Sequence, residues 1–271
     1  MKYSFLLTTV IASIVLYSCS KKTIPAAYDP NVKSELTIEF DNVVGNQQLQ
    51  LNTGTYTNAN NEQFTVSLLQ YFISNVKLKK MDGTEYVVPQ DSAYFLIRER
   101  DAATHKIRLK VPEGEYHSLS FVLGVDSLRN TKPLAERKGV LDPASYSGEE
   151  SMYWSWNSGY IFYKMEGNSP AAPADGAGNR KFRYHIGLFG GMTAPTINNI
   201  KNISLSLMDK GMPKVKTGKT PNVHLLVDIL KMFNGGTNVS ITTNSTVMVT
   251  PFSAVVANNY QNMFTHDHTE N

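Results

Sequence analysis

The segment KFRYHIGLF, residues 181–189, decides the fold class. Every second residue from Phe182 to Leu188 is aromatic or aliphatic, and alternate residues of an extended chain point to the same side. His185 falls on the other side, next to Gly187, whose small size leaves room beside the imidazole ring. The pattern predicts a β-strand with one face in the core and His185 on the opposite face.

Strand patterns of the same kind recur on both sides of this segment. Alternation, or enrichment in β-branched and aromatic residues, predicts strands at Ser34–Phe40, His105–Val111, Ser118–Val125, Asn202–Leu207 and in NVHLLVDIL at 222–230. Helix is expected only as a turn within Phe64–Phe72 and as a short segment at Phe252–Phe264, and an exposed loop is expected at 167–179. We therefore predict a mainly β fold, an antiparallel β-sandwich or partly closed barrel with a few short helices.

The N-terminus has the pattern of a bacterial lipoprotein signal. A lysine precedes an apolar run from Phe5 to Leu16, which is too short to span a bilayer, and Cys19 follows Leu-Tyr-Ser as in a lipobox. We expect a signal peptide at 1–18, a flexible tether at 19–33 after a lipidated Cys19, and one domain at 34–271. The mature protein is then anchored to the outer membrane of the cell envelope, and its face, periplasmic or external, stays open.

Composition and motifs exclude several function classes. The formal charge is only +3 and no long block of Lys or Arg occurs, so nucleic acid is not expected as a partner. There is no glycine-rich phosphate loop, no Gly-x-Ser-x-Gly elbow and no His-Glu-x-x-His. The one cysteine is used as the anchor, and no carboxylate pair or triad stands out. We therefore expect a binding protein without catalytic turnover.

Three histidines far apart in the sequence are candidate metal ligands. His185 lies in the strand described above, His224 lies in a predicted strand that also contains Asp228, and His268 follows Asp267 near the C-terminus. A β-sandwich can bring such segments to one point. Imidazoles without thiolates suit copper, zinc or nickel. Each histidine taken singly is also explained by a surface position, and the last one by a disordered terminus.

The aromatic segment MYWSWNSGYIFYKMEG, residues 152–167, contains both tryptophans of the chain, Trp154 and Trp156. Residues two positions apart on a strand point to one face, so the pair makes a good core layer. The same residues are also candidates for a functional aromatic site. Both interpretations remain open from the residues alone.

Four blocks in order resemble the signature blocks of the MbnP-like family: LLQYFISNVKL at 68–78, VPEGEYHSLSFVLGVD at 111–126, the segment at 152–167, and RYHIGL at 183–188. The resemblance covers nearly the whole mature chain, from about Glu35 to the end. The family contains periplasmic or surface copper-binding proteins, many of them lipoproteins, and some are encoded beside a di-haem MauG-like peroxidase partner.

The resemblance implies roles for particular residues. In relatives, the di-haem partner oxidises a tryptophan to kynurenine, whose aniline nitrogen is implicated in copper binding, and Trp154 and Trp156 match this block. The family histidine falls on His185, the Asp-His pair falls on 267–268, and His224 is a weaker correspondence. One departure is Asp41, because the N-terminal strand TIEFDNVVG has no histidine where some relatives supply a ligand.

Two functions follow. The first is an envelope lipoprotein that binds copper for uptake, storage or homeostasis through His185, His224 and His268, with a soft ligand from Met152, Met165 or Met263. The second is a glycan- or protein-binding surface lipoprotein with an aromatic platform. Convergence of the histidines favours the first function, whereas exposed aromatic faces favour the second.

Overall fold

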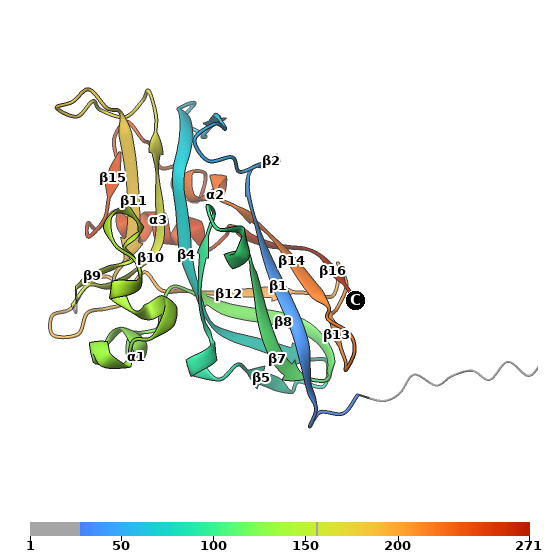
Figure 1. Ribbon diagram of the computed structural model, residues 1–271. Helices are drawn as coiled ribbons and strands as arrows, with labels where there is room; N and C mark the ends of the chain where they lie inside the picture. The colour runs from blue at the N-terminus through green and yellow to red at the C-terminus, as the bar shows by residue number, and fades with distance from the viewer. Residues whose placement is uncertain (1–27, 156) are drawn as a thin grey trace, which may run out of the picture.

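The computed structural model describes residues 28–155 and 157–271, which form two packed β-sheets with a few short helices (Figure 1). The signal peptide, Cys19, the tether up to residue 27, and Trp156 lie outside the described residues. Within the predicted tether, Tyr28 donates a hydrogen bond to Glu115, and the Asp29 N–H donates one to Glu113. The described end of the tether is therefore attached to the domain.

The smaller sheet has the strand order β16-β14-β1-β2, and β7 pairs with β1. Its strands are β1 (Lys33–Val44), β2 (Gln47–Gln48), β7 (Lys106–Pro112), β14 (Asn222–Asp228) and β16 (Phe264–Glu270). β1 runs parallel to β14 and antiparallel to β7, and β16 runs antiparallel to β14. This arrangement places the C-terminal strand two positions from the N-terminal one.

The larger sheet has the order β12-β8-β4-β10-β11-β15, with five shorter strands paired to this path. Its main strands are β4 (Gln63–Lys80), β8 (Gly114–Leu123), β10 (Gly159–Asn168), β11 (Lys181–Gly187), β12 (Lys201–Ser206) and β15 (Thr246–Val247). The shorter strands are β3 (Tyr56–Thr57), β5 (Glu85–Val87), β6 (Tyr94–Arg98), β9 (Tyr153–Ser155) and β13 (Lys214–Val215).

The helices are short. They are α1 (Ser127–Asn130), α2 (Leu230–Phe233) and α3 (Ser253–Tyr260), with 3-10 turns at Gln90–Ser92, Ala102–Thr104, Leu134–Glu136, Gly139–Leu141, Pro143–Ser145 and Gly148–Glu150. In the part of the chain that the structure describes, none of the helices has the length and apolar character needed to cross a membrane.

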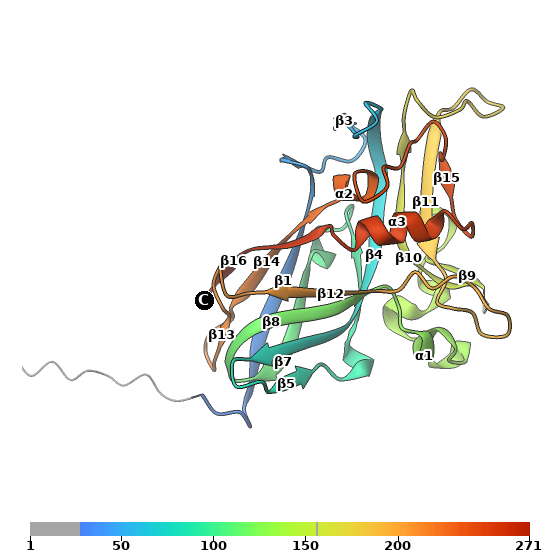
Figure 2. The same cartoon turned by 180° about the vertical axis from the view of Figure 1, so that it is seen from behind.

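The predicted fold class is confirmed: the chain is mainly β, and its sheets curl into half-barrels (Figures 1 and 2). Most strand pairs are antiparallel, but β1 with β14 and β11 with β15 are parallel. The predicted strands at 34–40, 105–111, 118–125, 181–189 and 202–207 correspond to β1, β7, β8, β11 and β12. Alternation therefore identifies the strands well where one face is buried.

Aromatic side chains fill the space between the two sheets. Phe40 of β1 lies edge-on to Phe121 of β8, with ring centroids 6.0 Å apart, and Phe121 lies edge-on to Phe264 of β16 at 5.1 Å. Edge-to-face pairs of this kind add to the stabilisation from burial itself. A second, smaller core lies around Phe72 and Tyr160, on the side of the molecule that carries β9 and α1.

The helical turn expected within Phe64–Phe72 is wrong, because these residues belong to the 18-residue strand β4. Residues 68–74 are all buried. Tyr71 points into the larger core and Phe72 into the second one, so β4 is covered on both faces. A strand buried on both faces reads as a continuous apolar run, which periodicity alone does not distinguish from a buried helix.

The end of the chain is ordered structure. The predicted helix at 252–264 corresponds to α3, and residues 264–270 form β16 instead of a disordered terminus. The exposed loop expected at 167–179 corresponds to the connection between β10 and β11, although its first two residues belong to β10, which extends to Asn168. β16 therefore holds His268 in a defined place in the smaller sheet.

Candidate metal centre

Three neighbouring strands of the smaller sheet bring histidines and carboxylates together at the end of the molecule that carries the C-terminus (Figures 1 and 2). His224 of β14 lies opposite His268 of β16 and beside Glu39 of β1. Its neighbours on β14, Val223 and Leu225, are buried in the core. His224 consequently projects from the outer face of the sheet.

A β-bulge in β16 gives the centre its third member. His268 pairs with His224 and His266 pairs with Leu225, so Asp267 is an extra residue between two consecutive pairs. Bulges change the direction in which side chains point. His266, opposite the core residue Leu225, is buried, whereas Asp267 and His268 both contact His224 on the outer face.

Asp267 lies between the two imidazole rings. Its Oδ2 atom is 3.2 Å from Nδ1 of His224 and 2.8 Å from Nδ1 of His268. One ligand atom from each of the three residues lies within 4.8 Å of the others. Two imidazole nitrogens and a carboxylate oxygen form a donor set that suits copper, zinc or nickel.

Uncompensated negative charge surrounds the two rings. Nε2 of His224 is 3.8 Å from Asp41 Oδ2, and Nε2 of His268 is 3.7 Å from Glu270 Oε1. Within the described residues, neither these carboxylates nor Asp267 forms an ion pair with Lys or Arg. The hydrogen bond with His268 lowers the pKa of Asp267, and Asp267 in turn raises the pKa of His268. The centre therefore attracts a cation.

His185 lies in a different environment. It is on β11 of the larger sheet, with Nε2 2.7 Å from Glu166 Oε1, and it is only 9% exposed. Lys164 and Arg183 also approach Glu166, at 3.8 and 4.0 Å. Burial shifts the pKa of Lys164 downward. Glu166 is already neutralised by basic neighbours, and the structure does not bring His185 into the group formed by His224, Asp267 and His268.

The family model of MbnP matches residues 33–249. The chain belongs to the MbnP family. Membership links it to copper-associated proteins. The fold is also similar to that of MbnP from Methylosinus trichosporium, with 16% sequence identity and a TM-score of 0.49 over 74% of this chain and 77% of that chain. No match was found among curated proteins.

Trp154 of this MbnP-family chain lies far from the histidine pair. Trp154 is on β9, which stands at the opposite end of the molecule from the C-terminal strand in both Figures 1 and 2. It packs against Gly187, where an added Cβ would lie 2.9 Å from its ring. Trp154 is therefore near the strand that carries His185, and Trp156 lies outside the described residues.

The methionines predicted as soft ligands are core residues. Met152, Met165 and Met263 are each at most 3% exposed, and Met165 accepts a hydrogen bond from Tyr163. Met165 and Met263 belong to the larger core and Met152 to the second one, whereas His224 and Asp267 meet on the outer face of the smaller sheet. The described residues of the centre therefore offer nitrogen and oxygen donors, and the predicted methionine sulfur ligands lie in the core.

Sequence reasoning did not place Asp267 or Asp41 among the candidate ligands. The sequence contains the Asp-His pair, but simple alternation puts Asp267 on the opposite face from His268, and only the bulge reverses this. Asp41 stands out in the sequence as a departure from the family. The structure places it beside Nε2 of His224.

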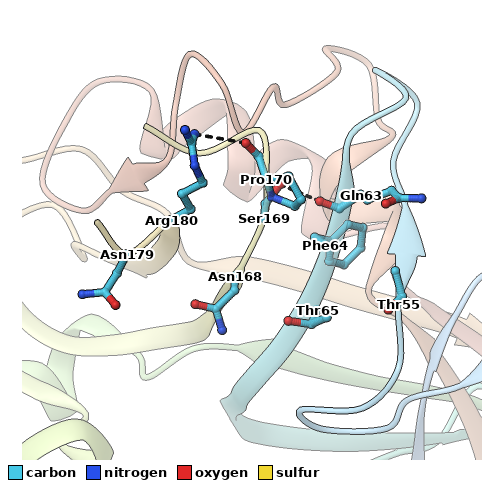
Figure 3. Close-up of a pocket in the computed structure, with 9 residues that line it drawn as sticks. All are labelled: Thr55, Gln63, Phe64, Thr65, Asn168, Ser169, Pro170, Asn179 and Arg180. Atoms are coloured by element: carbon cyan, nitrogen blue, oxygen red, sulfur yellow. Dashed lines mark hydrogen bonds between the residues drawn. The ribbon is translucent and has the colours of Figure 1, made fainter. Parts of the chain in front are cut away.

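A groove of about 500 Å³ lies between the start of β4 and the loop that joins β10 to β11 (Figure 3). Amide and hydroxyl side chains line it, including the exposed Gln63 and Asn168 and the half-buried Thr65, and no histidine or carboxylate is among its described lining residues. Phe64, its one aromatic residue, is 1% exposed. Among the described residues Tyr28 is the one exposed aromatic residue, and the others, including Trp154, are half-buried or buried, so these residues show no cluster of exposed aromatic faces.

Proposed function

We propose that this protein binds a copper ion at the outer face of β1, β14 and β16, for uptake, storage or homeostasis of copper in the cell envelope. The observation that carries the proposal is the convergence of His224, Asp267 and His268 on one point. Membership of a copper-associated family supports copper over zinc and nickel, which the donor set also suits.

The residues provide reversible coordination and no turnover. His224 and His268 would each hold the copper ion through an imidazole nitrogen, and Asp267 would hold it through a carboxylate oxygen. The bound ion would be cargo and would carry out no reaction. The centre is partly open, since the His268 side chain is 47% exposed and that of His224 17%. An ion can therefore be exchanged with a partner or with solvent.

The cellular setting belongs to the same proposal. Lipidation of Cys19 would anchor the chain to the outer membrane, and the tether would give the domain freedom at the membrane surface. A di-haem peroxidase is the proposed partner, acting on the tryptophan block. β9, which carries Trp154, stands at the opposite end of the molecule from the C-terminal strand, and this supports an indirect role for a modified Trp154, through folding or partner contact, over direct ligation.

The test is copper content per chain for the mature protein isolated from its own host. Wild type should contain about one copper per chain. His224→Ala and His268→Ala should each lower copper content and affinity, the affinity by at least the roughly 10–100-fold that loss of a ligand's outer-shell partner costs, because each removes a ligand itself. His185→Ala is the matched control, since it also removes a histidine next to a carboxylate. Copper loss in the control but not in the other two variants would move the site to β11, and a copper-free wild type would refute the proposal.

A further inference from the structure

Each histidine of the centre has a carboxylate on both sides of its ring. Nδ1 of His224 and of His268 faces Asp267, as described above, and the opposite nitrogen faces a different carboxylate. For His224 this carboxylate is Asp41, and for His268 it is Glu270. Asp41 lies on β1 and Glu270 on β16, the two strands on either side of β14. Each carboxylate lies at nearly the same distance from the Nε2 atom of its histidine.

We propose that Asp41 and Glu270 are positioning residues, which hold the ring protons of His224 and His268 on Nε2 and thereby assign ligation of the ion to both Nδ1 atoms. The inference rests on the proposed function, because it specifies how the same centre binds its metal. It concerns residues outside the converging group of three.

The argument follows from the protons of the imidazole ring. A neutral ring carries one proton, and the nitrogen that ligates a metal must present its lone pair. Without an ion, the N–H at Nδ1 donates to Asp267. When Nδ1 becomes the ligating atom, a neutral ring keeps its proton by moving it through water to Nε2, and a charged ring releases one proton to solvent.

The Nε2–H formed in this way needs an acceptor. Asp41 and Glu270 lie 3.8 and 3.7 Å from the two Nε2 atoms, about an ångström beyond hydrogen-bond length. Rotation of a ring or of a carboxylate closes such a gap. A carboxylate that accepts the distal N–H of a ligating histidine fixes its orientation and raises the basicity of the ligating nitrogen.

The register of the sheet explains why Asp41 is available for this role. Glu35 and Glu39 precede it on the same face of β1, but Glu35 pairs with Arg108 and Glu39 with Lys106. The pairing of β7 with β1 ends at Glu39, so no cation of β7 faces Asp41.

Neutral amides hold both outer carboxylates. The Gln48 side chain donates to Asp41 at 2.6 Å, and the Asn222 side chain donates to Glu270 at 3.4 Å. These bonds orient the two carboxylates and leave their charge available to the rings.

The experiment compares metal affinity and ring tautomers in the full mature chain. Cu²⁺ affinity is measured by competition with a chelator for wild type, Asp41→Ala, Asp41→Asn and Glu270→Ala. Removing either carboxylate should weaken binding about tenfold or more at unchanged stoichiometry. Asp41→Asn should recover part of the loss, because its amide oxygen still accepts an N–H. Glu35→Ala is the matched control and should bind like wild type.

Nitrogen NMR of wild type loaded with Zn²⁺, a diamagnetic probe, identifies the ligating atoms and does not depend on any variant. Nδ1 ligation of both rings with the affinity losses above supports the inference. Nε2 ligation, or unchanged affinity in both alanine variants, overturns it while leaving the proposed function intact. A wild-type chain that binds neither ion overturns the proposed function, and the inference with it.

Discussion

Two regions of the molecule place a histidine against a carboxylate on a β-strand, and they differ in how that carboxylate is neutralised. At the C-terminal end, Asp41, Asp267 and Glu270 surround His224 and His268, and among the described residues none of the three forms an ion pair with Lys or Arg. On β11, Glu166 has His185, Lys164 and Arg183 within 4.0 Å. A His-carboxylate contact is thus a candidate metal site only where the negative charge is in excess.

The two regions also differ in solvent exposure: the group around Glu166 is more buried than the group around Asp267. Lys164 is 4% exposed, and its ammonium group donates to the carbonyl groups of Glu149 and Ser151, just before β9. The Asp267 side chain, in contrast, is 41% exposed. The group around Glu166 therefore serves as a structural link that holds the segment leading to Trp154, and the group around Asp267 is accessible to an ion.

The largest expected difference between the regions is in stability. Glu166→Ala leaves Lys164 without its counter-charge and His185 without its hydrogen-bond acceptor in a mostly buried place, so we expect it to lower the free energy of unfolding by about 3 kcal/mol. Asp267→Ala removes an exposed carboxylate and should cost less than about 1 kcal/mol. Urea unfolding of both variants measures the difference, and Glu166→Gln shows how much depends on charge. Equal losses in the two alanine variants would contradict the comparison.

A smaller effect is expected from the contact between Trp154 and β11. An added Cβ at Gly187 would lie 2.4 Å from the Tyr160 carbonyl oxygen and 2.9 Å from the Trp154 ring. Gly187→Ala should therefore displace the ring, change tryptophan fluorescence and cost about 2 kcal/mol. Copper affinity should stay within about twofold, because the ligands are at the other end.

Gly176→Ala is the control for this substitution, since no atom lies within 4 Å of a Cβ at that position. A tenfold loss of copper affinity in Gly187→Ala that accompanies the fluorescence change, and is absent from Gly176→Ala, would show that the tryptophan end and the histidine end are coupled.

Much of the fold was accessible from sequence because most strands bury one face. β1, β7 and β11 alternate apolar and polar residues, and this period survives in the structure. β4 was misread at Phe64–Phe72 because its centre is buried on both faces, which removes the alternation. The parallel pairing of β1 with β14 leaves no local signal, since the two strands are far apart in the chain.

The candidate site was accessible only in part. Histidines can be recognised in the sequence, but whether they meet depends on register, and His185 stands in another sheet from His224 and His268. The bulge that turns Asp267 toward the rings follows from pairing across β14. The charge balance that distinguishes Asp267 from Glu166 likewise depends on neighbours from other strands.

A change of pH should affect copper binding at the histidine centre and protein stability at Glu166 in different pH ranges. The hydrogen bond with Asp267 raises the pKa of His268 above its ordinary 6.5, so the metal-free chain retains a proton that ligation must displace. Copper affinity should then fall about tenfold per pH unit as the pH drops through this raised pKa. At the other region, the hydrogen bond with His185 contributes to lowering the pKa of Glu166 below 4.5, against the opposing effect of its burial. Its stabilisation is present above pH 4.5 and is lost only as the pH falls below that value.

At about pH 5.5 the chain should therefore be folded and weakly metal-binding, as measured by chelator competition and urea unfolding on one sample. In Asp267→Asn, NMR titration should give a lower His268 pKa; an unchanged value would show that the raised pKa has another origin.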